Sequence, residues 1–406
     1  MANEGHTIRF VPGALDNLFR GEADAGKVVQ QIGDVLDRPS SRNIGALYLS
    51  LTDEGAISVV DAAIDLIQKA TLDPDRFGSF FEWLVRTAPD REPVKFAKAM
   101  LGLLAGDSFR DVFLTLGAHE EFTKYAAVAL SNALPEDEAR TAQFELAKSV
   151  DGWGRIDLVE RLAPNGGPEF RHWLVRHGFQ NSIMNEYLAW TAAHHGQLLD
   201  QLQAPSAASD SDLLDGAAGI FEALVMGGPA EDMGDYDDAL AAVHVWLDLV
   251  SRTDATLPRA RAVQLILHHA EDDRCTWTDA ASKAIADQAS EYLARPELRD
   301  TVTRDLKSGK DEYWQAKALA PTLGIDPWPF IFDLQASDSQ TNTWFDLMKT
   351  DEADRVDRVL QLAEQQLPLE EIANVSALEM GLGPDWRAHS ALDFIVQSLD
   401  AHPGKG

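Results

Sequence analysis

The chain has very little cysteine and few basic residues. A single cysteine, Cys275, is present among 406 residues, so no internal disulfide can form. A lone thiol is typical of proteins from a reducing compartment, and the cytoplasm is therefore the expected location. Lysine and arginine together number 35 against 66 aspartates and glutamates, which gives a formal charge of −31 at pH 7.

Long hydrophobic runs are missing as well. No stretch approaches the roughly 18 uninterrupted apolar residues that a membrane-spanning helix requires, so no membrane association is expected. The first residues, MANEGHTIRFVPG, lack a basic segment followed by an apolar one, and we expect no secretory signal. Alternating β-branched runs are almost absent, and TIRFV (7–11) is the single strand candidate.

Familiar catalytic motifs are also absent. We find no G-x-G-x-x-G after a strand, no GxxxxGK[ST], no G-x-S-x-G nucleophile elbow and no catalytic cysteine context. The usual nucleotide-binding and hydrolase chemistries are therefore unsupported, and no cofactor is expected. The sequence leaves enzymatic activity open but favours a protein without it.

The negative charge is unevenly distributed. Between Arg176 and Arg252 there is no lysine or arginine, whereas twelve acidic residues fall there. By contrast, residues 152–185 carry four arginines against three acids. Nucleic acid is not expected as a partner, because phosphate contacts need a field of the opposite sign. The acidic stretch either keeps the protein in solution or forms a face for a basic partner.

Short amphipathic segments separated by Gly or Pro breaks follow one another along the whole chain. In residues 54–73, apolar side chains recur at helical spacing from Val59 to Ala70, and Pro74 ends the segment. About eighteen helices of roughly 10–18 residues are expected in this way. This rhythm predicts an all-α protein made of stacked helical hairpins rather than a few long bundles.

The rhythm also predicts the domain organisation. Residues 1–20 read as a loosely held N-terminal lead-in, and residues 21–406 as a single helical-repeat array. The stretch QAPSAASDS (203–211) is rich in small and polar residues, so it is a candidate for a bend or boundary. The helical pattern is the same on both sides of it.

The segment Asp151–His195 shows the alternation of short helices and Gly or Pro breaks most clearly. It reads Asp151-x-x-x-Arg155-x-x-x-Val159-x-x-Leu162, followed by a break and a helix over Pro168–His177. This pattern resembles a degenerate repeat of the HEAT/armadillo superfamily, and the resemblance covers residues 75–200 best. The resemblance implies a curved α-α superhelix, used mainly for binding proteins, in which an Asp or Arg near a helix start orders the inter-helix turn.

The same segment holds the candidate binding residues. Arginine, tryptophan and tyrosine are enriched in binding hot spots, and Glu186 shares a helix face with Trp190. The candidates for the surface are Arg155, Arg171, Arg176, Asn181, Asn185, Glu186 and Trp190. In the alternative interpretation, the tryptophans belong to the hairpin core and the arginines satisfy turn carbonyls. No catalytic residue is assigned.

The run HHAEDDRC raises the question of a metal site. On a continuous helix, His268, Asp272 and Cys275 would lie at i, i+4 and i+7 on one face, and all three are possible zinc ligands. The same residues also fit a helix end followed by a polar loop, because protonated histidine is favoured at a helix C-terminus. No second ligand motif accompanies them, and no metal is assigned.

Taken together, the sequence predicts a non-catalytic interaction module that binds a protein partner on its concave face, and a basic protein is one candidate for that partner. A first alternative is an enzyme on the same scaffold that acts on a nucleic acid base or a small polar ligand. A second is an acidic inhibitor or immunity-type protein for a basic partner.

Overall fold

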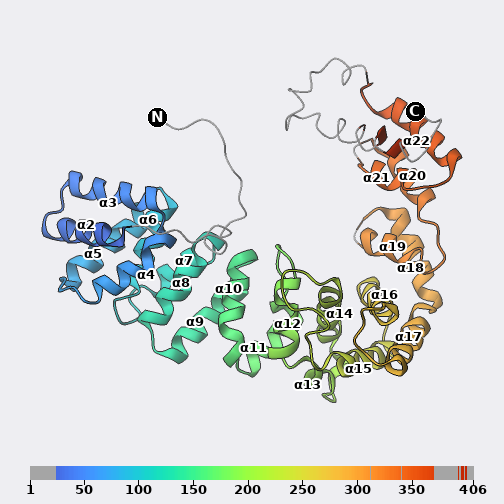
Figure 1. The fold of residues 1–406 in the computed structure, drawn as a ribbon, viewed down its shortest axis with the longest axis horizontal. Coiled ribbons are helices and arrows are strands. Elements are labelled where there is room, and N and C mark those ends of the chain that lie inside the picture. Colours follow the sequence, from blue (N-terminus) through green and yellow to red (C-terminus); the bar gives the residue numbers. More distant parts are fainter. Residues whose placement is uncertain are drawn as a thin grey trace. The chain divides into compact units, whose positions relative to one another are not determined.

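The computed structural model describes residues 24–310, 312–339 and 341–369, together with residues 392, 395, 396, 398 and 399. All regular secondary structure in this part of the chain is helical, so the predicted all-α class is confirmed (Figure 1). The predicted lead-in at residues 1–20 and the strand candidate TIRFV (7–11) lie outside the described residues. None of the helices described combines the length and apolar character needed to span a bilayer.

Contacts between residues divide the chain into two compact units, Met1–Trp246 and Leu247–Gly406. The division falls within helix α15 (Ala239–Ser251). The predicted bend near residues 203–211 lies inside the first unit, between α13 (Leu198–Leu202) and α14 (Ser211–Met226). The bend itself stays a prediction.

The first unit is built from short helices with brief connections. In chain order the others are α2 (Ala25–Asp37), α3 (Ser41–Glu54), α4 (Ala56–Ile67), α5 (Pro74–Thr87), α6 (Arg91–Leu101), α7 (Arg110–Gly117), α8 (Glu120–Ala133), α9 (Glu136–Ser149), α10 (Gly152–Leu162), the 3₁₀ turn η1 (Ala163–Asn165), α11 (Pro168–Trp173), the π-helix η2 (Leu174–Gly178), α12 (Glu186–His195) and the 3₁₀ turn η3 (Ala207–Ser209).

Most of these helices form pairs, and the second helices of the pairs pack in a row. α5 packs on α6, α7 on α8, and α9 on α10, while α4, α6, α8, α10 and α12 each contact the next second helix along the chain, and the row ends at α14 (Figure 1). Small residues allow this close approach: a Cβ atom added at Gly102, directly after α6, would lie 2.5 Å from the Ala129 Cα of α8. The unit therefore has the stacked helical-hairpin arrangement that the sequence rhythm predicts.

The helix predicted over residues 54–73 is shorter than expected. Val59 and Ala63 are fully buried as their spacing predicts, but α4 ends at Ile67, and Ala70 is exposed outside the helix. The backbone N–H groups of Lys69 and Ala70 turn back to carbonyls three residues earlier, which closes the helix with a tighter turn. Pro74 then begins α5 instead of ending α4.

Helix α3 begins with a serine cap. The Ser40 hydroxyl accepts a hydrogen bond from the Asn43 backbone N–H at 3.2 Å and caps α3. A serine before an apolar-periodic segment is the normal signal for a helix start, so this helix was predictable.

The second unit is likewise built from short helices that pack on one another. These are α16 (Leu257–Glu271), α17 (Asp279–Leu293), α18 (Pro296–Ser308), α19 (Tyr313–Leu319), α20 (Trp328–Ser337), α21 (Trp344–Met348) and α22 (Ala353–Gln366). α16 packs on α17 and α19, and α20 packs on α18 and α21. The indole of Trp328 is buried, and its Nε1 donates to the Leu347 carbonyl at 2.9 Å, which ties α20 to α21.

Candidate functional site

The start of α10 is fastened to the loop that precedes α12. Asp151 Oδ1 accepts hydrogen bonds from the backbone N–H of Gly152 at 2.7 Å and of Ser182 at 3.0 Å. Arg155 donates from Nε to the Val150 carbonyl at 2.9 Å and from one terminal nitrogen to the Gln180 carbonyl at 2.6 Å. An Asp and an Arg at a helix start thus order an inter-helix turn, the role that the family resemblance implies.

This arrangement shifts the pKa values of both Asp151 and Arg155. Partial burial opposes ionisation of Asp151, but the hydrogen bonds from Gly152 and Ser182 outweigh it, so the pKa of this carboxyl is lowered. Burial lowers the pKa of the Arg155 guanidinium, and the charge of Asp151 partly restores it. Arg155 is therefore occupied within the fold, in agreement with the interpretation that the arginines satisfy turn carbonyls.

Asn181 and Asn185 shape the loop between η2 and α12. Asn181 Oδ1 accepts from the backbone N–H of Ile183 and Met184 at 3.0 and 2.9 Å. Its amide nitrogen donates to the carbonyls of Phe179 and Met184, and its own backbone N–H donates to Asn185 Oδ1 at 3.1 Å. These two side chains hold Met184 at the surface just before α12 begins.

The helix predicted over Pro168–His177 is not a uniform α-helix. It changes after Trp173 into the π-helix η2, in which the Phe179 N–H donates to the Leu174 carbonyl at 3.2 Å, five residues earlier. The backbone of η2 also meets α14 closely, since a Cβ atom at Gly216 would lie 2.2 Å from the Val175 carbonyl oxygen. Amphipathic spacing alone does not distinguish such a widened turn from an α-helix.

Arg176 of η2 faces inward. Only 6% of it is exposed, and it forms a 2.7 Å ion pair with Asp210, the N-cap of α14. It also donates to Gln201 Oε1 at 2.6 Å and to the His172 carbonyl at 2.9 Å. Burial opposes ionisation of Asp210, but the Arg176 hydrogen bond and charge lower the pKa of that carboxyl. Arg176 therefore joins η2 to α13 and α14 and is not part of the surface that we propose below.

Arg171 lies beside the same helices. One terminal nitrogen donates to Gln197 Oε1 at 2.7 Å, and its carbonyl accepts from Gln201 Nε2 at 3.1 Å. Burial lowers the pKa of the nearby His195 imidazole, and the charges of His194 and Arg171 lower it further. Among the three predicted arginines, Arg155 thus donates to backbone carbonyls, Arg176 has both backbone and side-chain partners, and Arg171 is held by glutamines.

Glu186 and Trp190 remain at the surface on α12, next to exposed methionines. Met184 is 40% exposed and Met226, the last residue of α14, is 57% exposed. Gly228 lies directly beside Glu186 and Met184, because a Cβ atom there would lie 3.1 Å from Glu186 Cβ and 3.8 Å from Met184 Cε. Trp190 donates from Nε1 to the Asp235 carbonyl at 3.1 Å and stacks on His194 with ring centroids 4.6 Å apart.

The loop after α14, residues 227–238, completes this surface with negative charge. Met233 and Tyr236 are buried and anchor it, and the Met233 N–H donates to the Leu224 carbonyl at 3.0 Å. Its acidic residues are all exposed: Glu231, Asp232, Asp235, Asp237 and Asp238. We call these five acids, with Met184, Glu186, Trp190 and Met226, the acidic edge.

An acid of the acidic edge, Glu231, also interacts electrostatically with Glu160 on α10. Loss of hydration raises the pKa of the Glu160 carboxyl, and the charge of Asp157 raises it further. Arg161 acts in the opposite direction, but the charge of Glu231 in the loop adds to the increase. The carboxylates of Glu160 on α10 and Glu231 in the 227–238 loop are thus close enough to interact, and the charge of Lys124, like that of Arg161, acts against the increase.

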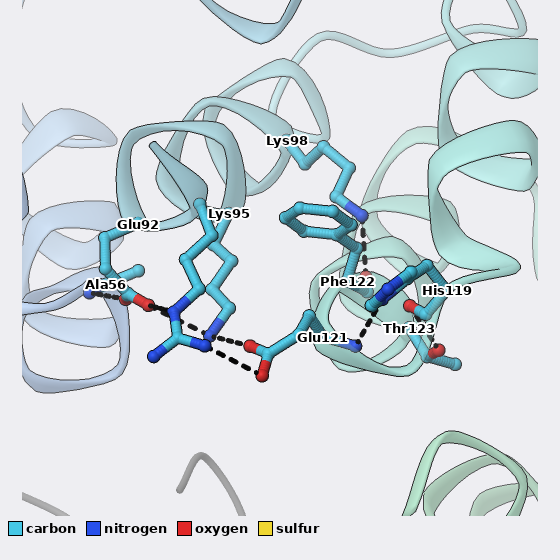
Figure 2. Close-up of polar contacts among 9 residues, drawn as sticks. Ala56, Glu92, Lys95, Lys98, His119, Glu121, Phe122 and Thr123 are labelled. Atoms are coloured by element: carbon cyan, nitrogen blue, oxygen red, sulfur yellow. Dashed lines mark hydrogen bonds and ion pairs between the residues drawn. The ribbon is translucent and has the colours of Figure 1, made fainter. Parts of the chain in front are cut away.

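A second charged region is buried between α6 and α8 (Figure 2). Lys95 Nζ lies 3.1 Å from Glu92 Oε1 and 2.9 Å from Glu121 Oε2, and its side chain is 2% exposed. Glu121 also pairs with Arg91 at 3.1 Å, and Glu92 Oε2 accepts from the Ala56 N–H at 2.8 Å, at the start of α4. Two cations and two carboxylates therefore balance one another between α6 and α8, and Glu92 also holds the start of α4.

Lys98, one turn further along α6, has no carboxylate in this arrangement. Its Nζ donates to the Phe122 carbonyl at 2.6 Å and lies 4.8 Å from the centroid of the Phe122 ring (Figure 2). Complete burial lowers the pKa of the Lys98 amine well below its usual value, and the charge of Lys95 lowers it further. We call Arg91, Glu92, Lys95, Lys98, Glu121 and Phe122 the charged junction.

The possible metal ligands in the second unit do not come together. α16 ends at Glu271, so His268, Asp272 and Cys275 do not share one helical face. Asp272 instead pairs with Arg274 at 2.9 Å, and the Cys275 Sγ lies 3.7 Å from the Ser282 hydroxyl. Hydrogen bonds from Arg274 lower the pKa of the Asp272 carboxyl. In the described part of the chain, no three His, Cys, Asp or Glu side chains are grouped to hold a metal ion.

Comparison with known proteins adds little. No family model matches the chain. No curated protein matches it either. Among solved structures, an engineered protein aligns over 92% of this chain and 99% of its own, with 17% identity and a TM-score of 0.25. A TM-score this low carries no argument about fold or function.

Proposed function

We propose that this protein is a non-catalytic, HEAT-like helical-repeat module whose first unit binds a basic protein partner at the acidic edge. The observation that carries the proposal is the combination of five exposed acids in residues 227–238 with the exposed methionines Met184 and Met226. No lysine or arginine lies between Arg176 and Arg252 to neutralise these acids.

The chemistry of this surface suits a partner segment that is both cationic and apolar. Methionine is flexible and polarisable, and it is frequent at surfaces that accept varied apolar side chains. The carboxylates would attract lysine and arginine, which speeds encounter and selects against acidic partners. An amphipathic basic helix, laid with its apolar face on Met184 and Met226, has both properties.

Rigid positioning supports the same proposal. Asn181 and Asn185 fix the segment before α12, and Trp190 fixes the loop through the Asp235 carbonyl. Buried Tyr236 anchors the other side of the loop. A surface that is ordered before binding loses less conformational entropy when the partner arrives.

A direct binding measurement tests this function. The double variant Glu231→Lys with Asp237→Lys reverses two exposed charges that accept no hydrogen bond in the loop, whereas Asp232 and Asp235 do accept loop hydrogen bonds. The matched control, Asp351→Lys with Asp354→Lys, reverses two exposed acids in the second unit. The probe is a fluorescent amphipathic helical peptide of leucine and lysine, followed by fluorescence anisotropy.

We expect the wild type and the control to bind the peptide and the 231/237 variant to bind at least tenfold more weakly. Raising the salt from about 50 to about 500 mM should weaken the wild-type complex as well, because exposed charges are screened. Proteins captured from a native lysate by the wild type, and not by the variant, should be basic. Equal binding by the wild type and the 231/237 variant would disprove the proposal.

A further inference from the structure

A hollow of about 340 Å³ lies among the second helices of the first unit. Its walls come from α4, α6, α8 and α10, and the next helix in the row, α12, carries Glu186 and Trp190 of the acidic edge. α10 packs on α12, where the rings of Trp153 and Tyr187 lie 5.1 Å apart. α10 therefore connects the wall of the hollow to the acidic edge.

The polar residues of α10 link the same two surfaces. Burial raises the pKa of the Glu160 carboxyl, and the charge of Glu231 in the acidic edge is among those that raise it further. Arg161 and Lys124, which line the hollow, lower the same pKa. Glu160 thus lies within electrostatic reach of the hollow and of the acidic edge, so one extended partner segment could contact both.

The side chains that line the hollow are mostly apolar. Ile57 and Val60 come from α4, Ala99 from α6 and Val128 from α8, and the ring of Tyr125 is buried beside them. Binding pockets are usually lined in this way, with a small number of polar groups that fix orientation. The lining offers contact area to an apolar group.

Arg161 adds a specific contact at this hollow. Its guanidinium is paired with both carboxylate oxygens of Asp157, at 2.7 and 3.2 Å, and its side chain is 37% exposed. A carboxylate paired in this way lies along the edge of the guanidinium and does not use its flat faces, which stack well on aromatic rings. Asp61 is exposed beside the hollow and attracts cations. The hollow therefore suits an aromatic ring that is next to a basic residue.

We infer that this hollow takes an aromatic side chain of the basic partner, next along the partner to the segment that binds the acidic edge. The inference rests on the proposed function, which supplies the basic segment. Charge complementarity supports this occupant, because Asp61 and the acids of the acidic edge attract basic residues on both sides of the ring. Aromatic side chains that fill pockets are frequent hot spots of protein interfaces.

The test uses the full chain and two fluorescent peptides. Both contain the amphipathic helix of leucine and lysine described above, extended by a glycine–serine linker, and one ends in tryptophan and the other in serine. Linkers of about 4, 8 and 16 residues, placed at each end of the helix in turn, span roughly 11 to 22 Å. Ala62→Trp fills the hollow from an exposed position in its lining, and Ala46→Trp is the matched control at an exposed position of α3.

With at least one linker, we expect the tryptophan-ended peptide to bind the wild type about tenfold more tightly than the serine-ended peptide, measured by fluorescence anisotropy. Leucine in place of the terminal tryptophan should bind about threefold more weakly than tryptophan, because it has no ring to stack on Arg161. Ala62→Trp should abolish the gain from tryptophan and leave the binding of the serine-ended peptide unchanged. Ala46→Trp should change neither.

Three results would overturn this inference and leave the proposed function standing. They are equal affinities of the tryptophan-ended and serine-ended peptides at every linker length, an equal gain from leucine, and a gain that persists in Ala62→Trp. Binding of neither peptide to the wild type would overturn the proposed function as well. Circular dichroism and the binding of the serine-ended peptide both show whether Ala62→Trp is folded.

Discussion

The charged junction and the acidic edge lie in the same unit. Charges are paired with one another in the junction, whereas at the edge they are exposed. In the junction, Lys95 is buried and meets two carboxylates within 3.1 Å, so almost every charge has a partner inside the fold. At the edge, five acids are exposed within twelve residues and no cation of the neighbouring sequence neutralises them. Charge paired in the interior holds helices together, whereas unpaired charge at the surface contributes little to stability and is available to a partner.

The largest effect should come from Lys95→Met. This change leaves Glu92 and Glu121, both mostly buried, without their shared cation, although Arg91 still contacts both carboxylates. Removing one partner of a buried ion pair costs about 3 kcal/mol of unfolding free energy. Urea unfolding measures this loss.

The control for this comparison is Lys283→Met, which breaks a pair with Asp287 in which both side chains are mostly exposed. It should change the free energy of unfolding by less than about 0.5 kcal/mol. Equal losses in Lys95→Met and Lys283→Met would show that burial does not distinguish the junction from the surface.

A smaller effect of opposite sign is expected from Lys98→Met. The buried amine has a lowered pKa, so the unfolded chain binds a proton there that the folded chain does not bind. Stability therefore rises with pH between this lowered pKa and the ordinary lysine value of 10.5, and the contribution is lost as pH falls through that window. Methionine cannot titrate, so the variant should gain about 1 kcal/mol at pH 7.

Urea unfolding of wild type and Lys98→Met at pH 7 and pH 9.5 checks this prediction. The difference in unfolding free energy between the two proteins should become smaller at the higher pH. A difference that does not vary with pH would mean that Lys98 keeps its ordinary pKa in the folded protein.

The smallest effect on stability should come from the acidic edge itself. Glu231→Lys with Asp237→Lys changes two exposed side chains, and the free energy of unfolding should shift by less than about 0.5 kcal/mol. Thermal unfolding followed by circular dichroism measures the shift. A loss similar to that of Lys95→Met would mean that these acids hold the loop in place, and the contrast between the two regions would disappear.

Local rules in the sequence were enough to predict most of the fold. Asp151 and Arg155 mark a turn between helices, and local signals of the same kind stand at Asp73 and Pro74 before α5 and at Thr256 before α16, although the sequence pattern predicted Pro74 only as the end of the preceding segment. These signals act over a few residues, so a single sequence contains them. The same signal at Ser40 identifies α3 once its hydroxyl is considered as a cap.

The candidate site depended on contacts that no local pattern encodes. Arg176 is buried because Asp210, 34 residues later, meets it, and Lys95 is buried because Glu121 does so from the next pair of helices. Residue type alone predicts that lysine and arginine are exposed. Glu186 and Trp190 were predicted as surface residues, but the methionines beside them, Met184 and Met226, were not, since isolated methionines are equally common in cores.

The lone thiol has a practical consequence. Cys275 is partly accessible in the turn between α16 and α17, and no other cysteine occurs in the sequence. A maleimide dye would therefore label the native protein at one known position, without any substitution, and would report on the second unit alone. Unfolding followed at the dye and unfolding followed by backbone circular dichroism would then separate the melting of one unit from that of the whole chain.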